Sequence, residues 1–160
     1  MIREIKTYPN KILKQKAKCI GQIDDATKKL IDDMVETLYA KGGAGLAANQ
    51  VGELKQVAVI EAGDGLKILI NPKILSKKGK IVAVEGCLSL PGYEFDVKRP
   101  QKIFVEYLDK SGQAQKLKAE DLLARVICHE VDHLQGKTLL DKLPLIKRLI
   151  LKRKIKKLTK

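Results

Sequence analysis

The spacing of hydrophobic residues predicts a helix in the first third of the chain. Apolar side chains recur there in pairs four residues apart, so they lie on one face of a helix. Asp24 or Asp25 can cap the start of this helix, which runs to about Ala40, and Gly42 with Gly43 ends it. The apolar face consists of Leu30, Ile31, Met34, Val35, Leu38 and Tyr39.

Short runs of β-branched and other apolar residues predict strands after this helix. They cover residues 56–60, 67–70, 80–84 and 102–108. The last run ends at a Lys-Ser-Gly turn, so we expect it to form a hairpin with the segment after Gln113. The first twenty residues show no regular spacing and are expected to form an irregular arm.

Helical spacing returns in the C-terminal part of the chain. A second helix is predicted from about Ala119 to Gln135, with Gly136 at its exit, and Pro144 can open a third helix. The order of helix, strands and helices predicts an α+β fold. We expect antiparallel or mixed sheets around the second helix, with a helix at the C-terminus.

Length and composition restrict the class of protein. The chain has 160 residues, which suits one domain over residues 1–160, and 44% of them are hydrophobic, enough for a folded core. No apolar run approaches the ~18 residues of a membrane span, and the N-terminus lacks the apolar core of a secretory signal. The cysteines are Cys19, Cys87 and Cys128, and an odd count favours a reducing compartment. We therefore expect a cytoplasmic protein without a membrane partner.

Positive charge is concentrated at the C-terminal end. The net charge is +13, and the last twenty residues hold nine basic residues and one acidic residue. Few aromatic residues are available to stack on bases, which argues against a sequence-reading nucleic-acid module, whereas contact with RNA phosphates is compatible with this charge. Residues 144–160 are therefore expected to form a basic helix and tail that either contacts the ribosomal RNA surface or is simply solvated.

The hydrophobic pattern of this C-terminal segment changes along its length. One apolar stripe is predicted to dock the helix on the domain, and it consists of Leu145, Ile146, Leu149 and Ile150. Ile155 and Leu158 fall on the opposite side among many basic residues, up to Lys160. We therefore expect the chain beyond Leu151 to project into solvent.

The strongest chemical signal is the sequence HEVDH within the second predicted helix. His129 and His133 are the only histidines, and residues four apart share a helix face, so two imidazoles can bind one metal ion. Glu130 lies beside them, where it can take a proton from a metal-bound water. The apolar residues of this helix, which include Leu122 and Val126, are expected to bury it and bring the site to the edge of the core.

A catalytic metal site needs a third protein ligand. Downstream of His133, position 139 is leucine and the only acid is Asp141, so the third ligand is expected upstream. Cys87 is the best candidate because it follows a predicted strand whose end could bring a thiolate to the helix. Cys19 lies in the irregular arm, and Cys128 points to another face of the helix, where it is expected to pack as a small buried side chain.

A third cluster of residues is the small-residue segment GAGLAANQ at 43–50. It follows a helix and precedes β-like sequence, so it is not a strand–loop–helix phosphate site. Small residues permit close approach of the backbone to a ligand, and Gln50 offers a side-chain amide as a donor. Taken alone, however, the segment favours a tight turn into a strand with Gln50 exposed.

Together, these three segments resemble the peptide deformylases. That family is marked by G-x-G-L-A-A-x-Q, E-G-C-L-S and H-E-x-D-H-L motifs in this order, which stand here at 43–50, 85–89 and 129–134. Residues 70–72 and 97–100 also look like family features, so the resemblance covers nearly the whole chain. One departure is Ala44, where a larger branched residue is usual, which could enlarge the pocket for the first side chain of the substrate.

The resemblance implies a metal-dependent hydrolase that removes the formyl group from the initiator methionine of nascent polypeptides and releases formate. It implies one divalent metal ion, natively Fe(II), with Zn(II) or Ni(II) as alternatives. The implied metal ligands are Cys87, His129 and His133. The implied catalytic groups are Glu130 as general base and acid, and Gln50 with the backbone N–H of Leu88 as oxyanion donors. The residues expected to bind the N-formylmethionyl peptide are Ala44, Gly45, Gly86, Leu122 and Val126.

The residues around Cys87 carry one further expectation. Glu85 and Arg99 flank the loop that presents Cys87, and a carboxylate–guanidinium pair between them would hold this loop in place.

Two other functions are consistent with parts of the sequence. A metallopeptidase could use HEVDH, although the missing downstream ligand and the EGCLS segment argue against it. A ribosome- or RNA-associated binding protein would explain the basic tail but would leave all three motifs without a role.

Overall fold

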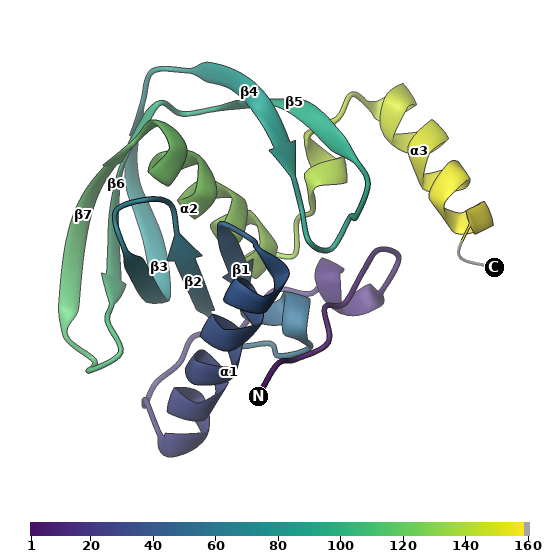
Figure 1. Cartoon of the computed structure of the whole chain (residues 1–160). Coiled ribbons are helices and arrows are strands. Elements are labelled where there is room, and N and C mark those ends of the chain that lie inside the picture. Colours follow the sequence, from purple (N-terminus) through teal and green to yellow (C-terminus); the bar gives the residue numbers. More distant parts are fainter. Residues whose placement is uncertain (159–160) are drawn as a thin grey trace.

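The strands of the chain form two antiparallel sheets (Figure 1). A computed structural model describes residues 1–158, with the side chains of residues 156 and 158 excepted. The strands are β1 (Gly45–Ala47), β2 (Val57–Glu61), β3 (Leu66–Lys78), β4 (Ile81–Gly86), β5 (Glu94–Arg99), β6 (Lys102–Leu108) and β7 (Ala114–Glu120). The helices are α1 (Asp25–Lys41), α2 (Asp121–Leu134) and α3 (Leu145–Leu158), with short 3-10 helices at Lys11–Lys14, Ala48–Val51 and Leu139–Lys142.

The larger sheet has the order β1-β2-β3-β6-β7, and β4 pairs only with β5 in a separate two-stranded sheet. The expected hairpin between residues 102–108 and the following segment is confirmed as β6 and β7. Figure 1 shows α2 crossing between the two sheets, with α1 below it. The expected α+β fold, with antiparallel sheets around the second helix and a helix at the C-terminus, is therefore confirmed. No helix of the described chain is long and apolar enough to cross a membrane.

Helix α1 forms where its spacing and caps predict. The Asp24 carboxylate accepts a hydrogen bond from the Thr27 N–H at 2.8 Å, and Gly42 ends the helix in the left-handed region with φ of 66°. Leu30, Ile31, Met34 and Leu38 are buried against β1 and β2. The assignment of Tyr39 to this buried face was wrong: the side chain is 57% exposed at the edge of the apolar stripe, and its hydroxyl donates to Glu61.

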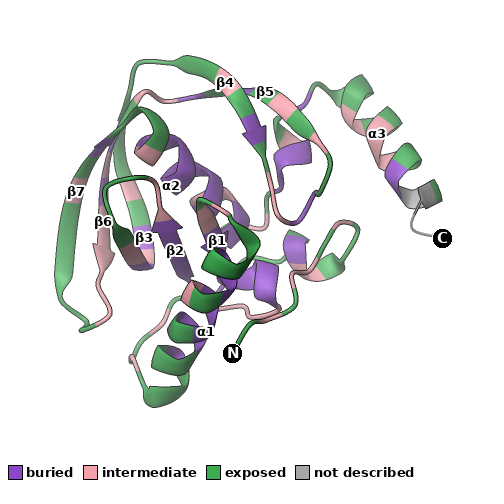
Figure 2. Cartoon of the chain, viewed as in Figure 1, coloured by how far each residue is buried: buried purple, intermediate pink, exposed green. Residues whose placement is uncertain are grey.

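Helix α2 lies between the two sheets and packs one apolar face against the larger one. Ala124, Ile127 and Cys128 are buried against the larger sheet, as Figure 2 shows by the buried colour on this helix. The burial expected for Cys128 is confirmed, and burial raises the pKa of its thiol. The expectation that Leu122 helps to bury the helix was wrong. Leu122 is 56% exposed, because it lies in the first turn of α2 and lines an open pocket.

Gly136 is required where α2 ends. Its φ is 73°, and a methyl group there would lie 2.7 Å from the Lys14 carbonyl oxygen. Gly136→Ala is therefore expected to lower the free energy of unfolding by at least ~1–2 kcal/mol, the cost of a left-handed non-glycine residue. Chemical denaturation measures this effect. Gly21→Ala is the control, since a methyl group at Gly21 meets no atom within 4 Å, and equal losses in both variants would contradict the steric argument.

Helix α3 docks through the opposite face from the one expected. Leu145, Ile146, Leu149 and Ile150 are between 49% and 74% exposed, so the docking stripe predicted from the sequence was wrong. Ile155 is instead buried, and it packs with Leu151 in a cluster that also contains Leu90, Tyr93, Val97 and Leu140. Ile155 is buried because the apolar surface around the Cys87 loop lies next to the later turns of the helix. The expectations for Leu158 and Lys160 lie outside the side chains that the structure describes.

Candidate active site

Two histidines lie on one face of α2, where the four-residue spacing places them. Their ring centroids are 4.9 Å apart, and the Nε2 atoms of His129 and His133 are separated by 3.2 Å. Both side chains are at least nine-tenths buried. Two imidazole nitrogens that face each other at this distance can bind a common ion.

Cys87 brings a thiol to the same point from the other side of the cleft. It follows the last residue of β4, and its Sγ lies 3.2 Å from the Nε2 of His133. The ligand atoms of Cys87, His129 and His133 all lie within 4.8 Å of one another. Among the described residues, this is the one group that could hold a metal ion.

Glu130 is buried beside this cluster. Only 3% of the residue is exposed, its Oε2 has no hydrogen-bond partner in the described structure, and burial raises its pKa to about 7. Strand β1 approaches the carboxylate closely: a methyl group on Gly45 would lie 2.5 Å from the Oε1 of Glu130. Glycine at position 45 is therefore required for this approach.

Gln50 is held firmly within the site. Its Oε1 accepts a hydrogen bond from the Ala47 N–H at 2.8 Å, and its Nε2 donates to the Ser89 Oγ at 3.1 Å and to the Cys87 Sγ at 3.6 Å. The side chain is 1% exposed, so the tight turn with an exposed Gln50, favoured by the segment alone, was wrong. The segment instead forms edge strand β1 and a 3-10 helix, which turn the amide inward.

The expected pair between Glu85 and Arg99 is confirmed as part of a larger network. Arg99 donates to both oxygens of Glu85, at 2.7 and 2.9 Å, and Arg125 adds a third bond at 2.6 Å. The Oε2 of Glu85 also lies 3.0 Å from the Nδ1 of His129. Burial would raise the pKa of Glu85, but Arg99 and His129 outweigh it and hold the pKa at about 2. The ionised carboxylate thus orients the ring of His129.

The charges around the histidines suit a cation. Burial lowers the pKa of His129, but the Cys87 sulfur and the Glu85 carboxylate outweigh burial and raise it to about 10. These surroundings stabilise positive charge at the place where the three ligand atoms meet. The pKa of His133 is well below its usual value because of burial and the neighbouring His129, so His133 is in the neutral form that binds metals.

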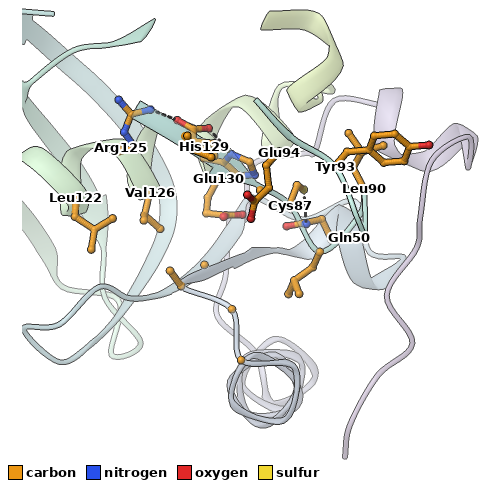
Figure 3. A pocket seen from close by; sticks show the side chains of 18 of the residues that line it. Gln50, Cys87, Leu90, Tyr93, Glu94, Leu122, Arg125, Val126, His129 and Glu130 are labelled. Atoms are coloured by element: carbon orange, nitrogen blue, oxygen red, sulfur yellow. Dashed lines mark hydrogen bonds and ion pairs between the residues drawn. The ribbon is translucent and has the colours of Figure 1, made fainter. Parts of the chain in front are cut away.

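A pocket of about 590 Å³ opens in front of these groups, within the usual range for ligand sites. Figure 3 shows side chains from α2, the Cys87 loop and the Gln50 segment around it. The expected ligands, catalytic groups and peptide-binding residues that line it are Ala44, Gly45, Gln50, Gly86, Cys87, Leu88, Leu122, Val126, His129 and Glu130. His133 lies behind this wall and is 1% exposed.

Sequence reasoning missed three participants. Arg125 lines the pocket and also donates to the backbone carbonyls of Ile81 and Val97, which ties α2 to both strands of the small sheet. A lone arginine in the apolar run LLARVI was the signal that could have indicated it. Glu94 lines the pocket from β5, a strand that was not predicted, and Ser89 receives the Gln50 amide.

Glu85→Ala tests the positioning network. The variant leaves two buried guanidinium groups without this carboxylate, so we expect a loss of about 3 kcal/mol in stability. Losing an outer partner of a ligating histidine also weakens metal binding, by ~10–100-fold. Denaturation and metal titration measure the two effects separately. Unchanged metal affinity in the folded variant would reduce Glu85 to a purely structural role.

Three possible ligand atoms beside a buried carboxylate are typical of hydrolases with a metal centre. The sequence model of the family described as polypeptide deformylase matches residues 2–149. The chain therefore belongs to the peptide deformylase family, enzymes that hydrolyse an N-formyl group.

Individual relatives agree over the length of the chain. The peptide deformylase of Thermodesulfovibrio yellowstonii is 45% identical and covers 97% of both chains, and that of Caldanaerobacter subterraneus is 48% identical over 88% of this chain and 89% of its own. Among solved structures, the peptide deformylase of Ehrlichia chaffeensis has a TM-score of 0.92 and 38% identity, and covers 100% of this chain and 98% of its own. A complex of the Ehrlichia enzyme with actinonin has a TM-score of 0.93 and 40% identity, and covers 98% and 96% of the two chains.

Proposed function

We propose that this enzyme removes the formyl group from N-formylmethionyl peptides, with Cys87, His129 and His133 as the ligands of one divalent ion. The single observation that carries the proposal is the meeting of three ligand atoms within 4.8 Å beside the buried, partnerless Oε2 of Glu130. We propose Fe(II) as the native ion, with Zn(II) or Ni(II) as alternatives, since one thiolate and two imidazoles accept all three. Such an ion would lower the pKa of water and polarise the formyl carbonyl.

Glu130 then moves the proton. Its buried carboxylate accepts a proton from the attacking water and returns it to the methionine nitrogen as the C–N bond breaks, which yields formate and a free amine. A pKa near 7 suits a group that must both accept and release a proton.

Gln50 and Leu88 stabilise the charge that develops on the formyl oxygen. Ala47 and Ser89 fix the Gln50 amide, so the N–H that donates to the Cys87 sulfur over a long 3.6 Å is the one available to the formyl oxygen. The backbone N–H of Leu88 supplies the second donor, since Leu88 follows Cys87 in the same loop and lines the pocket.

The peptide binds between two strand edges. The far edges of β1 and β4 are unpaired within the described sheets, so Gly45 and Gly86 can offer backbone hydrogen bonds to an extended substrate. The methionine side chain enters the apolar part of the pocket near Leu122 and Val126. Ala44 leaves this part wider than a branched residue would.

Formate release from formyl-Met-Ala by the metal-loaded enzyme tests the proposed function. A longer formyl peptide in the same assay distinguishes a deformylase from a metallopeptidase, because a deformylase releases formate and leaves internal peptide bonds intact. Internal cleavage without formate would support the metallopeptidase alternative.

The C-terminal helix suggests a second partner, the RNA phosphates of the ribosome from which nascent chains emerge. Its last turns expose Arg153, Lys154 and Lys157. A cytoplasmic location, where this partner is found, agrees with the three free cysteines of the chain. Deleting the chain after Leu151 would remove buried Ile155, so charge replacement is the better test.

Changing Arg153, Lys154 and Lys157 together to glutamine is expected to weaken co-sedimentation with ribosomes and to reduce its salt dependence. Turnover of formyl-Met-Ala serves as the control and should stay within twofold, because these side chains lie outside the pocket. Unchanged co-sedimentation would show that the tail is only a solvated end.

A further inference from the structure

Glu94 occupies a defined position at the substrate pocket. Strand β5 pairs with β4 so that Glu94 stands opposite Gly86, and directly opposed residues share one face of a sheet. The Glu94 Oε1 would lie 3.7 Å from a methyl group on Gly86, so the carboxylate extends over the glycine that flanks Cys87. Figure 3 shows the Glu94 side chain directed into the pocket beside Cys87.

The charge of Glu94 is not matched by a neighbour. Within the described residues, the side chain of Glu94 makes no hydrogen bond or ion pair, and the residue is exposed. The other charged groups of the pocket wall are engaged or buried: Arg125 bonds to Glu85 and to backbone carbonyls, and Glu130 lies behind Gly45. An enzyme with a net charge of +13 thus presents a free carboxylate beside its proposed peptide channel.

We propose that Glu94 makes the enzyme prefer formyl peptides with a lysine or arginine at the second or third residue. This inference rests on the proposed function, which places the formyl group at Cys87 and runs the peptide past Gly86. The residues that follow the methionine then pass the Glu94 carboxylate, and a cationic side chain there gains an ion pair. Because the pair is open to solvent, we expect a two- to fivefold preference in kcat/KM at low salt, expressed in KM and weakened by added salt.

The experiment compares tripeptide amides that differ in one side chain. Formyl-Met-Lys-Ala-amide and formyl-Met-Ala-Lys-amide are each compared with the peptide in which glutamine or glutamate replaces lysine. The wild type should favour lysine over glutamine and glutamine over glutamate at one of the two positions. Glu94→Gln should remove the preference, and Glu94→Lys should reverse it.

Asp96→Asn is the matched control. Asp96 lies two residues further along the same face of β5, opposite Val84, and does not line the pocket. Asp96→Asn removes one negative charge, as Glu94→Gln does, so the two variants have the same net charge. Asp96→Asn should keep both the preference and the turnover of formyl-Met-Ala. If the wild type releases formate without a charge preference, this inference is wrong while the proposed function stands. The same holds if the preference survives in Glu94→Gln, or if it disappears equally in Asp96→Asn. Absence of formate from every peptide would instead overturn the proposed function.

Discussion

Glu130→Ala is expected to reduce kcat by several orders of magnitude while the protein keeps most of its metal. The carboxylate lies next to the ligand cluster, but it is not one of the three groups that meet there. General acid–base catalysis commonly contributes ~10²–10⁴-fold to the rate, and in the proposed mechanism one group serves both proton transfers. Formate release under saturating substrate and elemental analysis of the purified variant measure the two quantities.

Two further variants sharpen this test. Glu130→Gln keeps the volume of the buried side chain and removes only its proton chemistry, so it should show the same loss of kcat without a packing defect. Glu120→Gln, at the N-terminal end of the same helix, changes a surface ion pair with Lys102 and should behave as the wild type. Loss of metal from Glu130→Gln, without a turnover defect in the metal that remains, would contradict the assignment.

Cys87→Ala is expected to abolish activity through loss of metal. The variant leaves two imidazoles without the sulfur that lies 3.2 Å from the Nε2 of His133. Metal affinity should fall by more than the ~10–100-fold typical of losing a mere outer-shell partner. Metal content after dialysis and formate release both report the effect.

The other two cysteines provide matched controls. Cys19 is exposed, so Cys19→Ala should change neither metal content nor turnover. Cys128→Ala removes a buried sulfur next to His129 and is expected to lower stability by about 1 kcal/mol, with the metal retained. If Cys19 proved to be the cysteine needed for metal binding, the ligand assignment would be wrong.

The parts of the fold with strong local signals could be predicted from the sequence. The caps and spacing of α1, the 102–108 strand and the helix carrying HEVDH all have short-range causes. Strand β5 was missed although residues 94–97 alternate charged and apolar side chains with the period of a strand. Pro91-Gly92 and Pro100 close to this short run favour a loop, and the strand forms through pairing with β4. The docking face of α3 was predicted wrongly because the sequence offers two apolar faces. Only the contact with the surface around Leu90 and Leu140 decides which of the two faces is buried.

The site shows the same division. The spacing of His129 and His133 fixes their common face, and the convergence with Cys87 followed from needing a third ligand. The burial of Gln50 depends on contacts with Ser89 and Ala47 that only the folded chain supplies. The network around Glu85 joins residues up to 44 positions apart, which no local pattern encodes.

The network around Glu85 holds the two sides of the site together without the help of a metal ion. Glu85 links β4 to α2 through Arg125 and His129, and Arg99 joins the network from β5. Arg125 adds bonds to the carbonyls of Ile81 and Val97, so protein contacts alone join the two sides of the ligand set. In a zinc finger, by contrast, the ion itself provides the folding free energy. Here, hydrogen bonds and ion pairs already join the two sides of the site, so we expect the fold to persist when a metal ion is removed or exchanged.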